Sequence, residues 1–137
     1  ICYDINYYLI YTQMLIGHAI DRVVNFYNLD CTVYLDSSGN ITCTVPQDNH
    51  TTEELTRKYN EFLSEYILNK LRVERNKLLN ESDWVQSRDV ILGNDEEWKI
   101  YRQTLRDLPA NSPDIDIDDN DELINVKYPE KPSVKKE

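Results

Sequence analysis

The sequence predicts a mainly α-helical protein with a small β-hairpin, and three features carry this prediction. Apolar side chains recur at helical spacing over residues 51–79, and again over the shorter stretch 94–109. Residues 31–45 hold two runs rich in β-branched side chains around a Ser-Ser-Gly turn. From residue 110 the chain turns acidic and contains prolines. We therefore expect a long helix, a helix-turn-helix module and an extended acidic C-terminal arm.

The same pattern predicts three parts along the chain. Residues 1–50 would form an N-terminal helix and the hairpin. Residues 51–109 would form the long helix and a module centred on two tryptophans. Residues 110–137 would form an extended tail. The 137 residues amount to about one domain, and the roughly one hundred that can pack give a core that is marginal without a partner.

Composition restricts the class of partner. The formal net charge is −10 and the pI is near 4.6, whereas a free nucleic-acid binder normally presents a basic face. Basic or apolar protein partners suit this charge better. The chain has ten tyrosines and only two phenylalanines. Tyrosine has an apolar ring with a polar tip, so these side chains serve either a small core or an interface.

The N-terminal stretch 5–27 predicts a helix with a broad apolar face. Polar residues, among them Thr12 and Gln13, interrupt it, and it falls short of the ~20 apolar residues that span a bilayer. We expect a buried or oligomer-forming helix and no membrane segment. Because no basic region precedes it, a signal peptide is also not expected. The first residue is Ile1 and not Met, so we expect the numbering to begin inside a longer or processed product.

In the hairpin, alternation places Val33 and Leu35 on one side and Tyr34 on the other. Gly39 supplies the positive φ of the turn. An isolated hairpin is unstable in water, so it must pack on the flanking helices or on a partner. Cys31 and Cys43 flank it; a disulfide stays open, although reduced thiols are the default for three cysteines without paired spacing.

The long helix has a start signal and an apolar stripe. Thr51 or Thr52, followed by glutamates, resembles a capping box. The helix would run to about Leu79, some 28 residues, or ~40 Å. Such a length suggests packing against another long helix, either in this chain or in a second subunit, and so allows a homo-oligomer. The stripe consists of Leu55, Tyr59, Phe62 and Tyr66, with Leu63, Ile67 and Leu71 beside them.

Beyond this helix lies the tryptophan-centred segment. Ser82 and Asp83 are better caps than helix formers, and Trp84 follows at once. We expect the second helix to begin at Asn94 or the next residue, whose side-chain oxygen can accept bonds from the first turn. Pro109 ends it. Its helical stripe is Trp98, Tyr101, Thr104 or Leu105, and Leu108.

These two tryptophan blocks resemble the tail assembly chaperone family of tailed bacteriophages. The family pattern is roughly R-x-x-R-[ND]-x-L-L-x-x-[ST]-D-W-T-Q, a short loop, W-x-x-Y-R-Q-x-L-R-D-[LI]-P and a W-P-x-K-P-like end. The first block is matched by Arg72, Arg75, Asn76, Leu78, Leu79, Ser82, Asp83, Trp84 and Gln86. The second is matched by Trp98, Tyr101, Arg102, Gln103, Leu105, Arg106, Asp107, Leu108 and Pro109. Val85 replaces the usual Thr, and Tyr128 stands for the last Trp.

The resemblance implies a non-enzymatic helper or component in building a viral tail or its fibres. One hypothesis is a chaperone that binds a viral structural protein in the host cytoplasm during assembly. The alternative is a permanent virion component, such as a fibre, adaptor or minor coat protein. The candidate partner-binding residues are Trp84, Trp98, Tyr101, Arg102 and Arg106. A structural interpretation competes with this one, in which the arginines bind carboxylates or carbonyls at Ser82 and Asp83 and the tryptophans form the core.

No pattern in the sequence indicates catalysis. His18 and His50 stand alone, no nucleophile is paired with a base, and there is no Gly-rich phosphate loop. No His/Cys cluster has metal spacing. Alternate aspartates from Asp114 to Asp118 resemble a Ca²⁺ loop, but the glycine and the final glutamate of that loop are missing. We therefore expect no enzyme, no cofactor and no metal.

Overall fold

The computed structural model describes residues 19–29, 33–43 and 50–135. The chain divides into two compact units. The first contains the described residues up to Tyr66 together with Ile117–Glu122, and the second contains Ile67–Asp116 and the residues from Leu123 onward. The mainly helical class with a small hairpin is confirmed. The three-part division at residues 50 and 109 stays a prediction.

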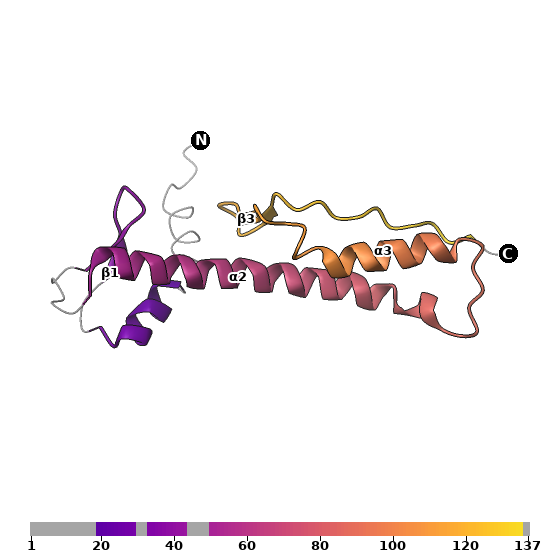
Figure 1. Cartoon of the computed structure of the whole chain (residues 1–137), viewed down its shortest axis with the longest axis horizontal. Helices are drawn as coiled ribbons and strands as arrows, with labels where there is room; N and C mark the ends of the chain where they lie inside the picture. Colours follow the sequence, from indigo (N-terminus) through magenta and orange to yellow (C-terminus); the bar gives the residue numbers. More distant parts are fainter. Residues whose placement is uncertain (1–18, 30–32, 44–49, 136–137) are drawn as a thin grey trace, which may run out of the picture. The chain divides into compact units, whose positions relative to one another are not determined.

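The first unit is built from a short helical segment, the hairpin and the first part of the long helix (Figure 1). Residues 19–27 are helical. Strands β1 (Val33–Leu35) and β2 (Ile41–Cys43) pair antiparallel, with Tyr34 opposite Thr42. The helix predicted over residues 5–27 is thus seen in its last part, while its beginning and Cys31 lie outside the described residues.

The hairpin turn forms as its residues predict. The Oδ1 atom of Asp36 accepts hydrogen bonds from the backbone N–H groups of Ser38 at 2.8 Å and Asn40 at 2.9 Å. The Asn40 bond is the main reason that the pKa of Asp36 lies below its ordinary value. Gly39 has a φ of 79°, a conformation that costs side chains strain. The turn chemistry therefore fixes the hairpin register.

The hairpin packs on helix α2 (Thr52–Glu81). The backbone N–H of Ile41 donates to the Thr56 hydroxyl at 2.9 Å, which ties β2 to the helix. Arg22 also binds Glu65 on α2 at 2.9 Å. Tyr34 faces outward, as alternation predicts, at 45% exposure. The buried core of this unit is Ala19, Val23, Ile41, Leu55 and Tyr59, and Val33, Leu35, Phe62 and Leu63 pack against it.

The predicted capping box opens α2. The Thr51 hydroxyl accepts from the N–H of Glu54 at 3.2 Å, and the Glu54 carboxylate accepts from the N–H of Thr51 at 3.1 Å. The helix has 30 residues and ends close to the predicted Leu79. At its end the Ser82 hydroxyl donates back to the carbonyls of Leu78 and Leu79, each at 3.0 Å. These bonds satisfy carbonyls that the last turn would otherwise leave without partners.

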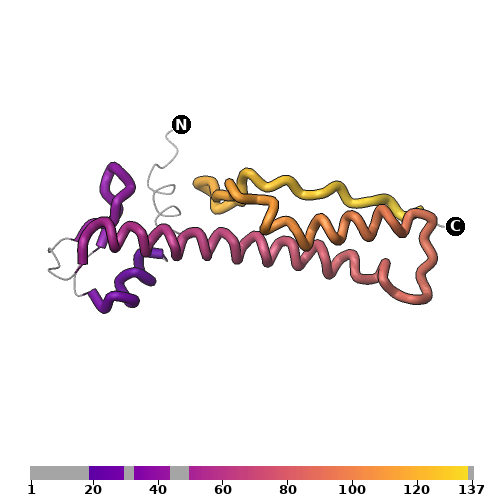
Figure 2. Tube along the Cα trace, in the orientation of Figure 1, coloured from indigo at the N-terminus to yellow at the C-terminus, as the bar shows by residue number. Residues whose placement is uncertain are grey.

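The second unit pairs the later part of α2 with helix α3 (Asp95–Asp107) through the short 3₁₀ helix η1 (Asp83–Gln86). The predicted stripe on α3 is confirmed, because Trp98, Tyr101, Leu105 and Leu108 are at most 4% exposed. Figure 2 shows α3 running back beside α2. The buried hydrophobic core of this unit consists of Val85, Trp98, Tyr101 and Leu105, and Leu78, Leu79 and Leu92 pack against it.

The C-terminal arm is extended, as predicted, but it also pairs two short strands and docks on the second unit, which the sequence did not predict. Two short strands, β3 (Asp116–Ile117) and β4 (Leu123–Ile124), pair first. The extended residues beyond them then run beside the two helices of the second unit (Figures 1 and 2). The arm contacts the helices through isolated polar residues and its sequence shows no hydrophobic periodicity, so local sequence patterns did not predict this docking.

Arm contacts fall on both helices. The Tyr128 hydroxyl donates to Glu74, and the Lys131 ammonium lies 3.9 Å from Glu81. Farther along, Asn94 Nδ2 donates to the Ser133 carbonyl at 2.8 Å. Within the described part of the chain, no helix is both long and apolar enough to cross a membrane.

Candidate functional site: the tryptophan-centred module

Arg102 is the polar centre of the second unit. It lies on the inner face of α3, and its side chain is only 6% exposed. One guanidinium nitrogen donates to the Leu79 carbonyl and to the Ser82 hydroxyl, both at 2.7 Å. The other donates to Asp83 at 2.7 Å and to Gln86 at 3.2 Å. The structural network predicted for the arginines at Ser82 and Asp83 therefore exists, and Arg102 makes it.

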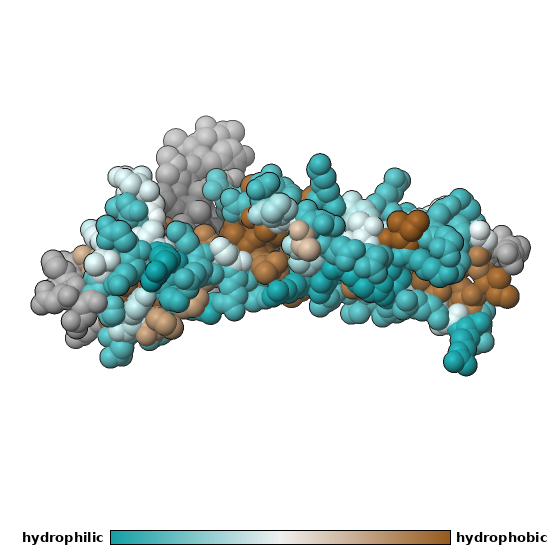
Figure 3. All heavy atoms as spheres, viewed as in Figure 1, coloured by the Kyte–Doolittle hydropathy of each residue, from teal (hydrophilic) through white to brown (hydrophobic). Residues whose placement is uncertain are grey.

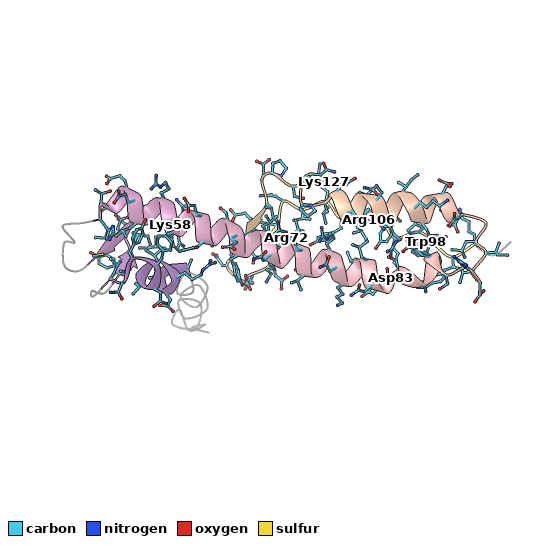
Figure 4. The ribbon with its side chains drawn as sticks, turned by 60° about the horizontal axis from the view of Figure 1, so that its bottom comes forward. Lys58, Arg72, Asp83, Trp98, Arg106 and Lys127 are labelled. Atoms are coloured by element: carbon cyan, nitrogen blue, oxygen red, sulfur yellow. The ribbon has the colours of Figure 1, made fainter. Side chains whose placement is uncertain are left out.

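This network fixes the turn between the two helices. A planar guanidinium offers donors in a fixed fork, so its acceptors must keep their relative positions. Here they come from the end of α2 and from η1, while the arginine comes from α3. Figure 4 shows Trp98 on α3 and Asp83 on the facing segment. Arg102 thus holds three consecutive elements together at the place where the chain reverses.

The aromatic rings stack edge to face beside this network. Trp84 and Trp98 have centroids 5.6 Å apart, and Trp98 and Tyr101 have centroids 5.9 Å apart. Trp98 is 1% exposed and belongs to the predicted core, whereas Trp84 is 41% exposed and lies at its rim. Burial raises the pKa of the Tyr101 hydroxyl, with the nearby Glu81 carboxylate adding to the effect. The module therefore presents one indole to solvent on top of a buried one.

An open groove of about 760 Å³ lies between α3 and the loop that follows η1. Figure 3 shows apolar atoms gathered where this loop lies, at the right of the view. Two large aliphatic side chains of the lining stay open to water: Ile91 is 71% exposed and Ile100 is 65% exposed. The lining consists of Val85, Gln86, Ser87, Arg88, Val90, Ile91, Leu92, Asp95, Trp98, Lys99, Ile100, Arg102, Gln103 and Arg106.

Charge in this groove is opposite to that of the whole chain. Four cationic side chains line it, against the single carboxylate of Asp95. Lys99 is neutralised by Asp95 at 2.7 Å and Glu96 at 2.8 Å, which raise the pKa of its ammonium well above the ordinary value. Among the residues that the structure describes, Arg88 and Arg106 have no ion pair. The groove thus combines exposed aliphatic surface with two unpaired guanidinium groups.

The end of the arm lies at the start of α3. We predicted that the Asn94 side chain caps the first turn, but it makes no such bond. Its oxygen instead accepts from the N–H of Lys135 at 3.3 Å. Its amide donates to Glu97 at 2.9 Å and to Ser133. The arm therefore forms hydrogen bonds with the side chain that would otherwise have capped the helix.

A carboxylate strengthens this junction. Hydrogen bonds from Asn94 and then from the Lys135 ammonium lower the pKa of Glu97 below its ordinary value. The backbone N–H of Gly93 also donates to the Lys135 carbonyl at 2.8 Å. Four hydrogen bonds within a few residues thus hold the arm beside the groove-bearing helix.

The structure places all five predicted site residues in the second unit but separates their roles. Trp98, Tyr101 and Arg102 are buried, and Trp84 packs on Trp98 from the exposed side. The fifth, Arg106, is exposed and lines the groove. Sequence reasoning did not single out Arg88, Ile91 or Ile100. Loop residues show no hydrophobic periodicity that would mark them. For Ile100, the available signal was an aliphatic side chain on the polar face of the predicted helix.

The second unit is thus a folded helical pair that bears an open, locally basic groove. Over residues 19–29, 33–43 and 50–135, no group of His, Cys, Asp and Glu has the arrangement of a metal site. The polar side chains at the centre are instead engaged in holding the fold.

The family model described as phage tail assembly chaperone protein matches residues 68–133. This range covers the later part of α2, η1, α3 and the arm, so this module is similar to that family, which is not an enzyme family. No curated protein and no solved structure matches the chain. The match supports a role in phage tail assembly.

Proposed function

We propose that this protein is an assembly chaperone that binds a structural protein of a viral tail or tail fibre through its second unit. The observation that carries the proposal is the family match over residues 68–133, which coincides with a module holding an open groove. The complex would form in the host cytoplasm during assembly and would dissolve before the particle is complete.

The five predicted partner-binding residues take two roles in this proposal. Trp84 and Arg106 are exposed and would contact the partner directly. Trp98, Tyr101 and Arg102 are buried and would act by holding the exposed groups in place. Indole and guanidinium groups are the side chains most often found at the energetic centre of protein interfaces.

Co-expression tests the binding claim. Tail and fibre proteins of the same virus would be expressed one at a time, with and without this chain. We expect the soluble yield of at least one of them to rise and the two proteins to elute together. A variant with Trp84→Ala and Arg106→Gln should lose this effect while keeping its circular dichroism. Lys127→Gln, an exposed change outside the groove, is the matched control.

The alternative is a permanent virion component carrying the same module. Quantitative mass spectrometry of purified particles separates the two. A chaperone should be absent from particles and present in lysates of infected cells. Stoichiometric copies in the particle would replace the chaperone proposal with the structural one.

Trp98→Ala addresses the buried aromatic ring. Because Trp98 is 1% exposed, its loss should unfold the module, as replacing a buried aromatic residue by Ala costs about 3–5 kcal/mol. Near-UV circular dichroism would report the loss. An intact spectrum combined with lost partner binding would instead give Trp98 a direct role at the interface.

A further inference from the structure

The groove between α3 and the loop after η1 differs from the rest of the molecule in charge. The chain has 25 acidic and 15 basic side chains, whereas the groove has four basic side chains and one acidic. Two of those cations, Arg88 and Arg106, keep their charge unpaired within the described part of the chain. A partner that adds carboxylates here gains attraction, while the acidic remainder repels the same carboxylates elsewhere.

The groove also exposes aliphatic surface that water disfavours. Ile91 on the loop and Ile100 on α3 are both more than 60% exposed and both line the groove. Covering aliphatic side chains stabilises a complex by roughly 25 cal/mol per Å² of apolar area. A ligand that matches this groove must therefore carry apolar side chains as well as negative charge.

From this combination we infer that the groove binds a short peptide segment of the tail protein in which carboxylates alternate with aliphatic side chains. The inference rests on the proposed function, since it names the chemistry of the segment that the chaperone holds. A volume of about 760 Å³ accommodates several side chains and falls within the ~300–1,000 Å³ of ligand sites. Nucleic acid fits less well, because its phosphates would meet only two unpaired cations and two isoleucines.

Direct binding tests the inference with defined probes. Three fluorescein-labelled peptides of equal length would alternate leucine with glutamate, glutamine or lysine. Fluorescence anisotropy with the full chain should show the glutamate peptide binding at least about tenfold more tightly than the glutamine peptide. Its affinity should fall as salt rises, because exposed charges are screened. Equal binding of the glutamate and glutamine peptides would overturn the inference.

Matched variants locate the binding. Arg88→Gln with Arg106→Gln removes the two unpaired cations and should weaken the glutamate peptide about tenfold. Arg57→Gln with Lys127→Gln removes two exposed cations outside the groove and should change it less than about twofold. Gln keeps the length and the helix propensity of the side chain. Equal losses of affinity in both double variants would show that only the overall charge matters and would refute the groove as the binding site.

A second pair of variants tests the contribution of the aliphatic side chains. Ile100→Gln should weaken the glutamate peptide roughly threefold to tenfold, because it removes exposed aliphatic surface on the groove. Val73→Gln removes a side chain that is 70% exposed on α2 and does not line the groove, so it should have no effect. An effect of Val73→Gln equal to that of Ile100→Gln would contradict the assignment.

Self-association is the competing occupant, since residues 114–118 of this chain also alternate aspartate and isoleucine. Sedimentation of the wild type and of the double arginine variant tests it. A dimer that only the arginine variant disrupts, without binding of the glutamate peptide, would replace the partner segment by a second copy. If a tail protein is solubilised but the glutamate peptide neither binds nor competes, the inference fails and the proposed function stands. If the peptide binds and no tail protein does, the proposed function fails.

Discussion

Replacing Arg102 by Met should destabilise the second unit far more than replacing its charged partner Asp83 by Asn. Arg102 makes four hydrogen bonds from a nearly buried position. Met keeps much of the volume but loses all four. The Leu79 carbonyl still accepts from the Ser82 hydroxyl, so the loss falls mainly on the bonds to Ser82, Asp83 and Gln86. We expect a cost of about 2–4 kcal/mol.

Asp83 differs because its side chain is 59% exposed. Water solvates its carboxylate with or without the arginine, and exposed ion pairs contribute about 0–1 kcal/mol. Asp83→Asn also keeps an oxygen that can accept from the guanidinium. We therefore expect a cost below about 1 kcal/mol for this variant.

Urea denaturation followed by tryptophan fluorescence measures both variants in one assay. The two tryptophans pack 5.6 Å apart beside the network, so their emission reports the unfolding of this unit. Circular dichroism at the same urea concentrations controls for changes confined to the fluorophores. If Arg102→Met lowered the free energy of unfolding by no more than Asp83→Asn, the network would not hold the turn.

Four further outcomes follow from contacts elsewhere in the structure. Asn94→Ala should free the end of the arm, so the backbone N–H of Lys135 should exchange with deuterium faster while the α2 core does not. The hydrogen bonds that lower the pKa of Glu97 stabilise the docked arm above the usual carboxyl pKa of 4.5, and this contribution is lost as the pH falls through the lower folded value. Exchange of the arm, corrected for intrinsic rates, should therefore rise on acidification before α2 opens; protection that is unchanged would contradict the assignment. Thr51→Ala should lower the free energy of unfolding by about 0.5–2 kcal/mol in thermal melts, and Thr51→Ser should retain most of it. Gly39→Ala should cost about 1 kcal/mol, because φ is 79° there.

Local signals predicted the helices well. The features concerned are the Thr51–Glu54 box, the stripe from Leu55 to Leu71 and the stripe on α3. Within each of them, successive residues lie only a few positions apart in the sequence, so periodicity and capping chemistry predict them directly. The arginine network was also predictable, because Arg102 lies on the second predicted helix and a Ser-Asp pair lies at the end of the preceding one.

Contacts between residues that lie far apart in the sequence and share no motif were missed. Asn94 was one of the two residues predicted to cap α3, but its side-chain oxygen accepts from the backbone N–H of Lys135, 41 residues away, and a sequence pattern cannot choose between the two donors. The structural interpretation placed Trp84 in the core while the partner-binding one made it a contact residue, and the structure leaves it 41% exposed. The groove was missed because Arg88 and Ile91 lie in a loop and meet α3 only through tertiary packing.

The anchoring of Lys135 to Gly93 and Asn94 has a practical consequence for anyone who handles this protein. A bulky affinity tag or fluorescent group fused directly to Lys135 would begin next to the first turn of α3, whose Asp95 borders the groove. Such an appendage would crowd incoming ligands and could be mistaken for weak binding. A cleavable tag at this end, removed before affinities are measured, keeps the approach to the groove open.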